Sequence, residues 1–216
     1  MSVWYTSPDN IPLDGQTVWV RLNYWFGQPF LAVWNLATEE FVSVDNSVHY
    51  PAWSISRWNP SNVIEYFDIG YKILGGSIFG DQQLRAMPVT VPKSCSIVSM
   101  SIFHLAGSEN FLLGVYSNGV DNLPDQLLAS IPLTQVSGVT EWQTVNLVSE
   151  LPLNAGDKVW LAFVFENNPG LFYSAGTPGR AASTFGWVSP LPSDFGDSSV
   201  TSFIFNIYAT CKVTIS

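Results

Sequence analysis

The sequence predicts an all-β protein in two parts: a small N-terminal β-barrel or curled sheet, followed by an antiparallel jelly-roll β-sandwich. The first observation is a short apolar run, Lys158–Glu166, between the turn residues Ala155-Gly-Asp and Asn167-Asn-Pro-Gly, which leaves no room for a helix. The second is an apolar alternation with period two in 98–102 and again in 203–207. The third is the composition, 14% aromatic and only 12% charged, which fits neither a disordered chain nor a helical bundle.

Residues 1–67 form the predicted N-terminal domain, which holds six of the nine tryptophans. A domain of this size buries little area per residue, and large rings compensate because each buries more surface than an aliphatic side chain. The tryptophans are therefore interpreted as core, with a row of surface rings that stack on sugars as the alternative. The predicted strands are Thr17–Tyr24, Phe30–Trp34, Phe41–Val44 and Trp53–Trp58.

The order of turns and tryptophans in this domain has a family likeness. The segments are Pro12-Leu-Asp-Gly-Gln-Thr-Val-Trp-Val, Ala32-Val33-Trp34, Phe41 and Ile55-Ser56-Arg57-Trp58-Asn59-Pro60. They resemble a small domain of unknown function that is common in phage and prophage genomes. The resemblance covers about sixty residues and implies a phage context without implying an activity.

Residues 68–84 are predicted to be a glycine-rich connector with one or two short strands. Gly70, Gly75, Gly76 and Gly80 are poor material for a helix. The run Gly75–Gly80 lacks the Lys-Ser/Thr of a phosphate-binding loop.

Residues 85–216 form the predicted sandwich, because strand signals recur at the spacing of such folds. The predicted strands are Arg85–Val91, Ser96–Leu105, Phe111–Ser117, Gln126–Pro132, Gln143–Val148, Lys158–Glu166, Leu171–Ser174 and Ser202–Val213. Eight antiparallel strands suit a jelly roll.

This part also has a family likeness, over about 130 residues. The segment Leu113–Ser130 and the segments Trp142–Leu147 and Leu153–Leu161 resemble a jelly-roll domain of bacterial surface and secreted proteins. The sequence has Asp125 where that pattern prefers glycine. Members of this family are similar in fold to carbohydrate-binding modules. A likeness in fold is weak support for carbohydrate binding, because one fold serves many functions.

The sequence offers few groups for catalysis, and no cofactor or metal site is predicted. His104 continues the apolar phase of 98–102 and is interpreted as a core residue, and zinc, phosphate-loop and dinucleotide motifs do not occur. Cys95 and Cys211 are interpreted as two free buried thiols, with a disulfide as the alternative. Carboxylates that meet across loops, among Glu166, Asp194 and Asp197, would be needed for a hydrolase.

The most distinctive region between strands is predicted to be the long loop 174–198. It carries an isolated arginine, a tryptophan in a Gly/Ser/Pro-rich setting and carboxylates, which are groups that bind sugars or partner loops. The alternative is a structural loop in which Arg180 pairs with Asp194 or Asp197. The candidate ligand-binding residues are Tyr173 and Trp187 for stacking, and Arg180 and Asp194 for polar contacts.

Charge and targeting signals narrow the functional classes. The net charge of −9, with only eight Lys and Arg, argues against nucleic-acid binding. Residues 1–5 lack the features of a secretory signal, and no apolar run reaches the roughly 18 residues of a membrane span. An adhesin-like composition without an export signal predicts a non-enzymatic virion protein that is assembled in the host cytoplasm: a head fibre, capsid decoration or tail accessory protein.

The expected partners are other virion proteins, contacted through residues 1–67, together with copies of the same chain in a trimer and a host-surface glycan. The alternatives are a stand-alone carbohydrate-binding module or lectin, and an unrecognised hydrolase.

Overall fold

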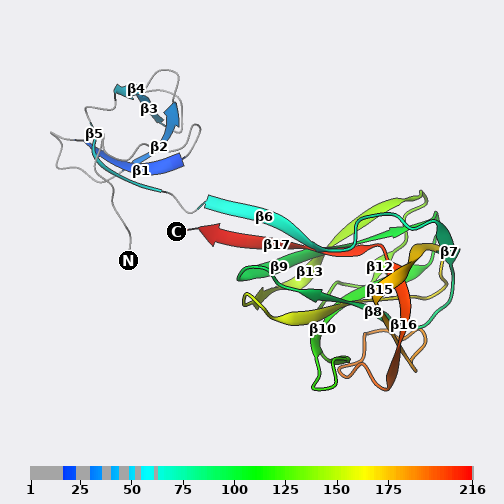
Figure 1. Cartoon of the computed structure of the whole chain (residues 1–216). Helices are drawn as coiled ribbons and strands as arrows, with labels where there is room; N and C mark the ends of the chain where they lie inside the picture. The colour runs from blue at the N-terminus through cyan, green and yellow to red at the C-terminus, as the bar shows by residue number, and fades with distance from the viewer. Residues whose placement is uncertain are drawn as a thin grey trace. The chain divides into compact units, whose positions relative to one another are not determined.

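A computed structural model describes residues 17–22, 30–35, 40–43, 49–51, 55–60 and 63–215. The described residues form strands and connecting turns without a helix, which confirms the all-β prediction (Figure 1). None of the described segments therefore forms a helix that could span a membrane. The chain divides into two compact units, one of Met1–Glu65 with Thr214–Ser216 and one of Tyr66–Val213.

The N-terminal unit contains a five-stranded antiparallel sheet in the order β4-β3-β2-β1-β5. Its core includes Val18 and Val20 of β1, and Trp34 packs against Phe41 with ring centroids 4.7 Å apart. Trp34 is thus a core residue, as interpreted from the sequence, and the side chains of the other tryptophans in this unit lie outside the described residues. The strands are β1 (Thr17–Leu22), β2 (Phe30–Asn35), β3 (Glu40–Ser43), β4 (His49–Pro51) and β5 (Ile55–Pro60).

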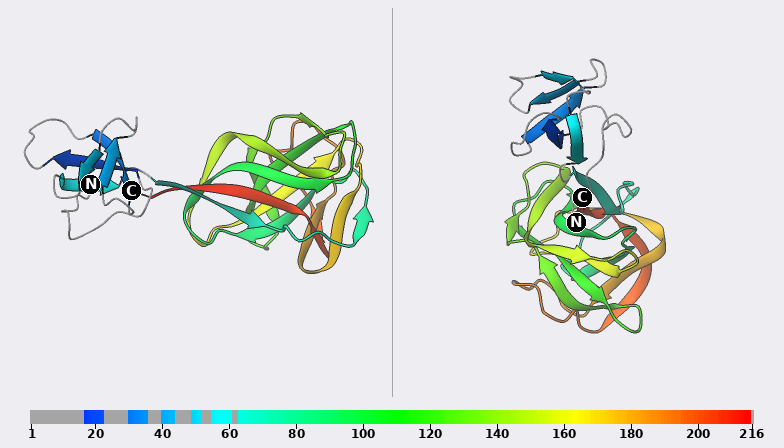
Figure 2. Two further views of the ribbon diagram at one scale, coloured as in Figure 1. Left: turned by 90° about the horizontal axis from the view of Figure 1, so that it is seen from above. Right: turned by 90° about the vertical axis from the view of Figure 1, so that its left-hand side faces the viewer.

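The second unit is an antiparallel β-sandwich made from one continuous twelve-stranded sheet that folds over on itself (Figure 2). The strands of one half are paired in the order β11-β10-β14-β8-β15, with β16 on β15, and those of the other half in the order β9-β17-β6, with β13 on β9. Strand β15 joins them, because Leu171 pairs with His104 of β9 while Ala181 and Ala182 pair with β8. The short strands β7 and β12 pair with β15 and β10.

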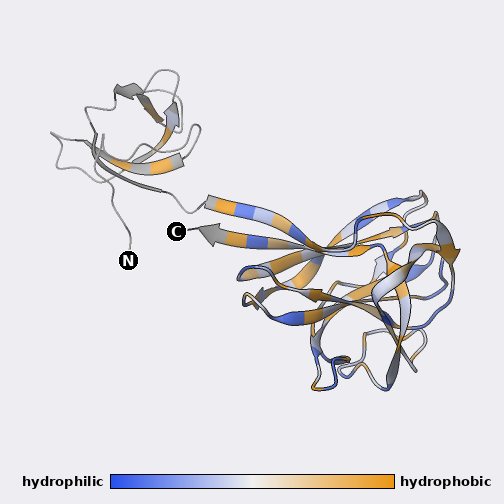
Figure 3. Cartoon of the chain, in the orientation of Figure 1, coloured by the Kyte–Doolittle hydropathy of each residue, from blue (hydrophilic) through white to orange (hydrophobic). Residues whose placement is uncertain are grey.

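The strands of the sandwich extend over the following residues: β6 (Val63–Gly70), β7 (Ser77–Phe79), β8 (Arg85–Thr90), β9 (Cys95–His104), β10 (Asn110–Asn118), β11 (Pro124–Ser130), β12 (Thr134–Gln135), β13 (Glu141–Leu153), β14 (Lys158–Phe165), β15 (Leu171–Ser183), β16 (Ser198–Phe205) and β17 (Ile207–Ile215). Hydrophobic and hydrophilic residues interleave along β6 and β17, as expected for strands with one solvated face (Figure 3).

The sheet that contains β8, β10 and β14 is buried on both faces. Alternate residues of these strands belong to two separate cores, one between the sheets and one on the outer face. The core between the sheets takes Val159, Leu161, Phe163 and Phe165 from β14. The outer core takes Trp160, Ala162 and Val164, and it is covered by Leu191 and Phe195 of the segment 184–197. This explains why β14 reads as a nearly continuous apolar run.

Two predicted boundaries in the C-terminal part were wrong. The predicted loop 174–198 begins with strand, because β15 continues to Ser183, and only residues 184–197 connect it to β16. The predicted strand Ser202–Val213 is two strands, since Asn206 interrupts the pairing. The side chain of Asn206 accepts a hydrogen bond from the Gly75 amide and donates one to the Ile73 carbonyl.

Those two hydrogen bonds attach the predicted connector 68–84 to Asn206. The connector contains the end of β6 and all of β7. Residues 66–84 belong to the compact unit of the sandwich. Gly75 lies directly against the backbone of Tyr173, where a Cβ atom would stand 2.0 Å from the carbonyl group. Gly75 therefore allows this segment to pack closely on the sandwich.

Candidate binding site

The four residues predicted to bind a ligand are distributed over the sandwich. Tyr173 is half-buried in β15 against the rings of Phe79 and Phe203, with centroid distances of 6.0 and 4.8 Å. Trp187 is half-buried against the outer core. Only Asp194 is exposed to solvent. The four side chains therefore do not form a single binding surface.

Arg180 lies in β15 rather than in a loop, with 6% of its surface exposed. The described residues do not pair it with Asp194 or Asp197, so that alternative prediction was wrong. Burial lowers the pKa of Arg180, and the negative charge of Asp81 opposes this shift. Its guanidinium lies over the ring of Phe203 at 5.7 Å, and that ring also contacts Tyr173.

The segment 184–197 is held on the sheet by backbone hydrogen bonds. The Leu127 amide donates to the Ser193 carbonyl at 2.8 Å, and the Phe195 amide donates to the Asp125 carbonyl at 2.8 Å. From the end of β15, the Ser183 hydroxyl donates to the Phe195 carbonyl at 2.6 Å. These bonds fix the segment beside β11. A hollow lies between the segment and the β10–β11 turn.

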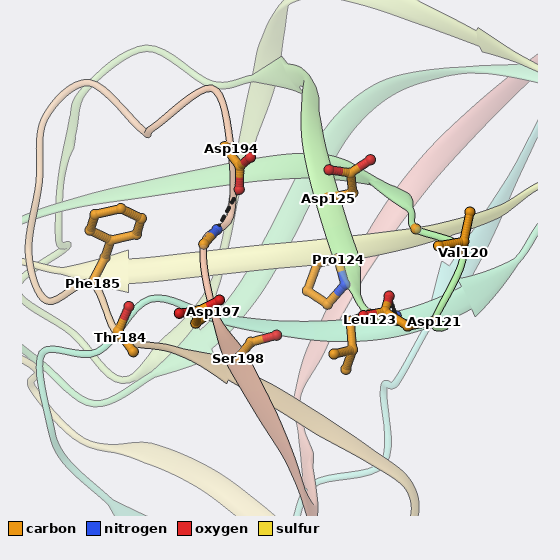
Figure 4. Close-up of a pocket in the computed structure, with 12 residues that line it drawn as sticks. Val120, Asp121, Leu123, Pro124, Asp125, Thr184, Phe185, Asp194, Asp197 and Ser198 are labelled. Atoms are coloured by element: carbon orange, nitrogen blue, oxygen red, sulfur yellow. Dashed lines mark hydrogen bonds between the residues drawn. The ribbon is translucent and has the colours of Figure 1, made fainter.

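This hollow has a volume of about 970 Å³ and is lined by the β10–β11 turn and by both ends of the segment 184–197. Four aspartates line it, and Figure 4 shows their side chains around the hollow with the ring of Phe185 at one side. Phe185 is 41% exposed. The aspartates are Asp121, Asp125, Asp194 and Asp197. We call these four aspartates and Phe185 the acidic hollow.

Hydrogen bonds orient three of the carboxylates, and Asp121 accepts one from the Leu123 amide at 3.2 Å. Asp194 accepts a hydrogen bond from the Gly196 amide at 2.7 Å, and the Gln126 amide group donates to both Asp125 and Asp194, at 3.0 and 3.3 Å. None of the four aspartates is ion-paired with a cation in the part of the chain that the structure describes. The described residues also contain no group of three or more His, Cys, Asp or Glu side chains placed to hold a metal. The acidic hollow thus offers hydrogen-bond acceptors and one ring face.

The outer face of the other sheet carries a continuous row of aromatic rings. Phe103 contacts Phe172 and Trp142 with centroid distances of 5.5 and 5.6 Å, and Trp142 contacts Tyr208 at 4.9 Å. All four rings are half-buried, and the ammonium group of Lys72 lies 4.6 Å from the centroid of Tyr208. We call Phe103, Trp142, Phe172 and Tyr208 the aromatic row.

The side chains of His104, Cys95 and Cys211 are buried in the core of the sandwich. His104 is fully buried, and its ring nitrogens lie 2.8 Å from the Leu105 carbonyl and 2.8 Å from Oε1 of Gln143. It is a satisfied core residue, as interpreted from the sequence. Cys95 and Cys211 are buried free thiols. Burial, followed by a hydrogen bond with Cys95, raises the pKa of Cys211 above its ordinary value.

The sequence prediction missed most of the acidic hollow. Phe185 falls inside the predicted loop 174–198 but was not singled out. Asp197 was considered only as a hydrolase carboxylate or as an ion-pair partner of Arg180, and Asp121 lies in the distant β10–β11 turn. One signal was present: Asp125 departs from the jelly-roll pattern at a turn, and this residue lines the hollow next to Asp194. The aromatic row gave no such signal, because its residues come from four different strands.

Comparison with known proteins shows a likeness in fold only. No protein-family model matches the chain, and no curated protein matches it. A clostridial cysteine protease, Cwp84 after propeptide cleavage, is similar with a TM-score of 0.50 at 10% identity, over 93% of this chain and 66% of that one. This chain therefore spans just under two thirds of that structure, and the likeness supports the β-rich fold and no activity.

Two structures of infectious bursal disease virus are more distant. The Gx strain structure matches with a TM-score of 0.33 at 10% identity, over 89% of this chain and 41% of that one. The VP2 subviral particle matches with a TM-score of 0.30 at 9% identity, over 97% and 53%. Likenesses of this size carry no functional conclusion.

Proposed function

We propose that the protein is a non-enzymatic structural and binding protein of a phage virion, as a head fibre, capsid decoration or tail accessory protein. Two sequence resemblances support this function, one in residues 1–67 to a phage domain and one in the sandwich to a jelly-roll domain of surface proteins. The sandwich adds a rigid scaffold, since one of its sheets is buried on both faces.

Within that role, the sandwich binds a host-surface glycan in the acidic hollow. The observation that carries this proposal is the convergence of four carboxylates and one exposed ring in a single concave site. Carboxylates are strong acceptors for the vicinal hydroxyl groups of sugars, and the face of Phe185 suits the apolar face of a sugar ring. Ligand sites are commonly concave, with a few convergent polar groups.

One such site binds weakly. The apolar area of one stacked ring contributes on the order of 1 kcal/mol. Many copies on a particle raise the overall affinity through avidity, provided that several sites engage one surface together. This arrangement suits a protein displayed on a virion.

The test is a glycan array and a host-cell binding assay with the full chain. Asp194→Asn combined with Asp197→Asn removes two charges while keeping side-chain volume, and Phe185→Ala removes the ring. Binding by the wild type is expected to be lost in both variants and retained by Glu141→Gln, which removes an exposed carboxylate outside the hollow. Loss of binding in Trp142→Ala alone would assign the glycan to the aromatic row instead and overturn the assignment to the hollow.

Assembly is tested separately. The virion role requires that the N-terminal unit docks on other virion proteins, and we propose that three copies associate there. The protein is expected to co-purify with mature particles and to have the mass of a trimer by light scattering. A protein that is monomeric at high concentration and absent from particles would refute the virion role. The result of the glycan assay would not be affected by that outcome.

A further inference from the structure

Two arginines lie side by side on the inner face of the sandwich. Arg85 of β8 pairs with Ala182 of β15, and Arg180 lies two residues from Ala182 on the same strand. Residues two apart on a strand share a face, so Arg85 and Arg180 are diagonal neighbours. Ala86 and Ala181, which pair with each other, face the outer core instead. The two guanidinium groups therefore enter the space between the sheets together.

Both side chains are buried with unused hydrogen-bond donors. Arg85 is 1% exposed and Arg180 is 6% exposed. Nη2 of Arg85 donates to a carboxylate oxygen of Asp81 and, at 3.3 Å, to Oε1 of Gln83. Nε and Nη1 of each arginine have no acceptor among the described residues. Buried N–H groups of a charged side chain normally have an acceptor, because leaving them unpaired is costly.

The charges at this place do not balance. Among the described residues, Asp81 is the carboxylate whose charge acts on both guanidinium groups. Burial lowers the pKa of Arg85 to about 10, and the positive charge of Arg180 adds to this shift. Two buried cations thus share one carboxylate, inside a chain whose net charge is −9. A second negative charge would balance the pair.

Aromatic rings surround the two guanidinium groups. The Arg85 guanidinium lies 4.1 Å from the ring centroid of Phe79 and 5.7 Å from that of Phe205, and Arg180 lies 5.7 Å from that of Phe203. Ring faces favour the cations but accept no hydrogen bond in the plane of a guanidinium. Asp81, with a side chain that is 33% exposed, marks the solvent side of this group.

We propose that Arg85 and Arg180 form a binding site for a small oxyanion, either a phosphate, a sulfate or a carboxylate group. Guanidinium groups bind such anions through paired N–H donors, and the four unpaired nitrogen atoms at this place are of that kind. The anion accepts the unpaired N–H donors and balances the charge, so its binding stabilises the folded sandwich. This site is separate from the acidic hollow and does not depend on the proposed glycan binding.

The test is thermal unfolding of the full chain in sodium phosphate and in sodium glucuronate, each compared with sodium chloride at equal ionic strength. Stabilisation by phosphate indicates a free inorganic anion. Stabilisation by glucuronate but not by phosphate indicates the acidic group of a larger ligand. Either result supports the site, with a Tm that rises by about 4 °C for each tenfold increase in anion concentration above Kd.

Arg180→Met keeps the length of the side chain and removes its charge and donors, so the anion-dependent rise in Tm is expected to disappear. Lys158→Met removes an exposed cation and should leave the rise unchanged. If Arg180→Met does not fold, Arg180→Lys keeps the charge but loses the paired donors, and at least a tenfold weaker anion dependence is expected. The proposal is overturned if neither anion raises the Tm of the wild type, or if the rise is the same in the Arg180 variants.

Discussion

The phenol group of Tyr116 donates a hydrogen bond to the carbonyl of Pro192 at 2.8 Å, from the last third of β10 to the segment 184–197. Tyr116 is fully buried, and its ring meets that of Phe195 edge-on with centroids 5.1 Å apart. This contact joins the sheet to the segment that covers it. The acidic hollow depends on the same segment, because Phe185, Asp194 and Asp197 all belong to it.

Tyr116→Phe should lower the free energy of unfolding by about 1 kcal/mol, because it removes one hydrogen bond and leaves the Pro192 carbonyl unpaired. Urea unfolding measures the change. Leu133→Ala, at a residue that is 54% exposed, serves as a control and should change stability less. Equal stability of Tyr116→Phe and wild type would show that the bond does not anchor the segment.

The same residue predicts a pH dependence. Burial, assisted by the charge of Asp194, raises the pKa of Tyr116 above its ordinary value of 10. A raised pKa in the folded state means that the stabilising protonated form is fully present below pH 10 and is lost as the pH rises further. Stability should therefore fall above pH 10 by at most about 1.4 kcal/mol per pH unit for this group. Tyr116→Phe should flatten this fall, and an unchanged slope would contradict the prediction.

Phe195→Ala should be far more destabilising than Trp187→Ala. Phe195 is fully buried in the outer core, so its removal leaves a cavity and costs about 3–5 kcal/mol, whereas Trp187 is half-buried and loses less contact. Phe185→Ala, at a ring that is 41% exposed, should cost least. Chemical denaturation of the three variants gives the order, and a larger loss in Phe185→Ala than in Phe195→Ala would show that the outer core is not covered as described.

The two thiols should be unreactive in the folded protein. Cys95 and Cys211 are buried, and the raised pKa of Cys211 makes its thiolate scarce at pH 8. Ellman's reagent should modify neither thiol within minutes in buffer and both of them in concentrated urea. Rapid modification of one thiol in buffer would indicate local opening of the sheet formed by β9 and β17. A denatured sample without any reactive thiol would indicate a disulfide.

Gly75→Ala should destabilise the sandwich by about 1–3 kcal/mol, because a methyl group there meets the backbone of Tyr173 and must displace it. Gly76→Ala is the matched control, since a Cβ atom at that position has no neighbour within 4 Å. Thermal unfolding compares the pair. Similar Tm values for the two variants would show that the segment does not pack against β15.

A fragment of residues 63–213 should fold without the N-terminal unit. The compact unit formed by Tyr66–Val213 contains both cores of the sandwich, and β6 begins at Val63. A single cooperative transition in urea, with the β-rich circular dichroism of the full chain, is expected. Limited proteolysis of the full chain should leave this fragment intact, and cleavage between residues 71 and 84 would instead support the predicted connector.

Most of the strands could be predicted from the sequence, because period-two alternation and turn residues are local signals. All eight strands predicted in the sandwich contain strand in the structure, including Lys158–Phe165 between its two turns. The ends were less predictable. The Gly- and Pro-rich composition of 174–183 is typical of a loop, but β15 continues through it because β16 pairs with it on both sides of an irregularity between Ala175 and Arg180.

The sequence by itself determined the all-β class, the apolar phase of each strand and the core position of His104, since each of these follows from residues close together in the chain. Only the tertiary structure decided that the segment 184–197 covers an outer core, that Asp121 and Asp194 line one hollow, and that Arg85 and Arg180 lie together. The reason is that strand partners and register are set by packing over long separations, and a change of one residue in the register of β8 or β15 would send Arg85 or Arg180 to the opposite face.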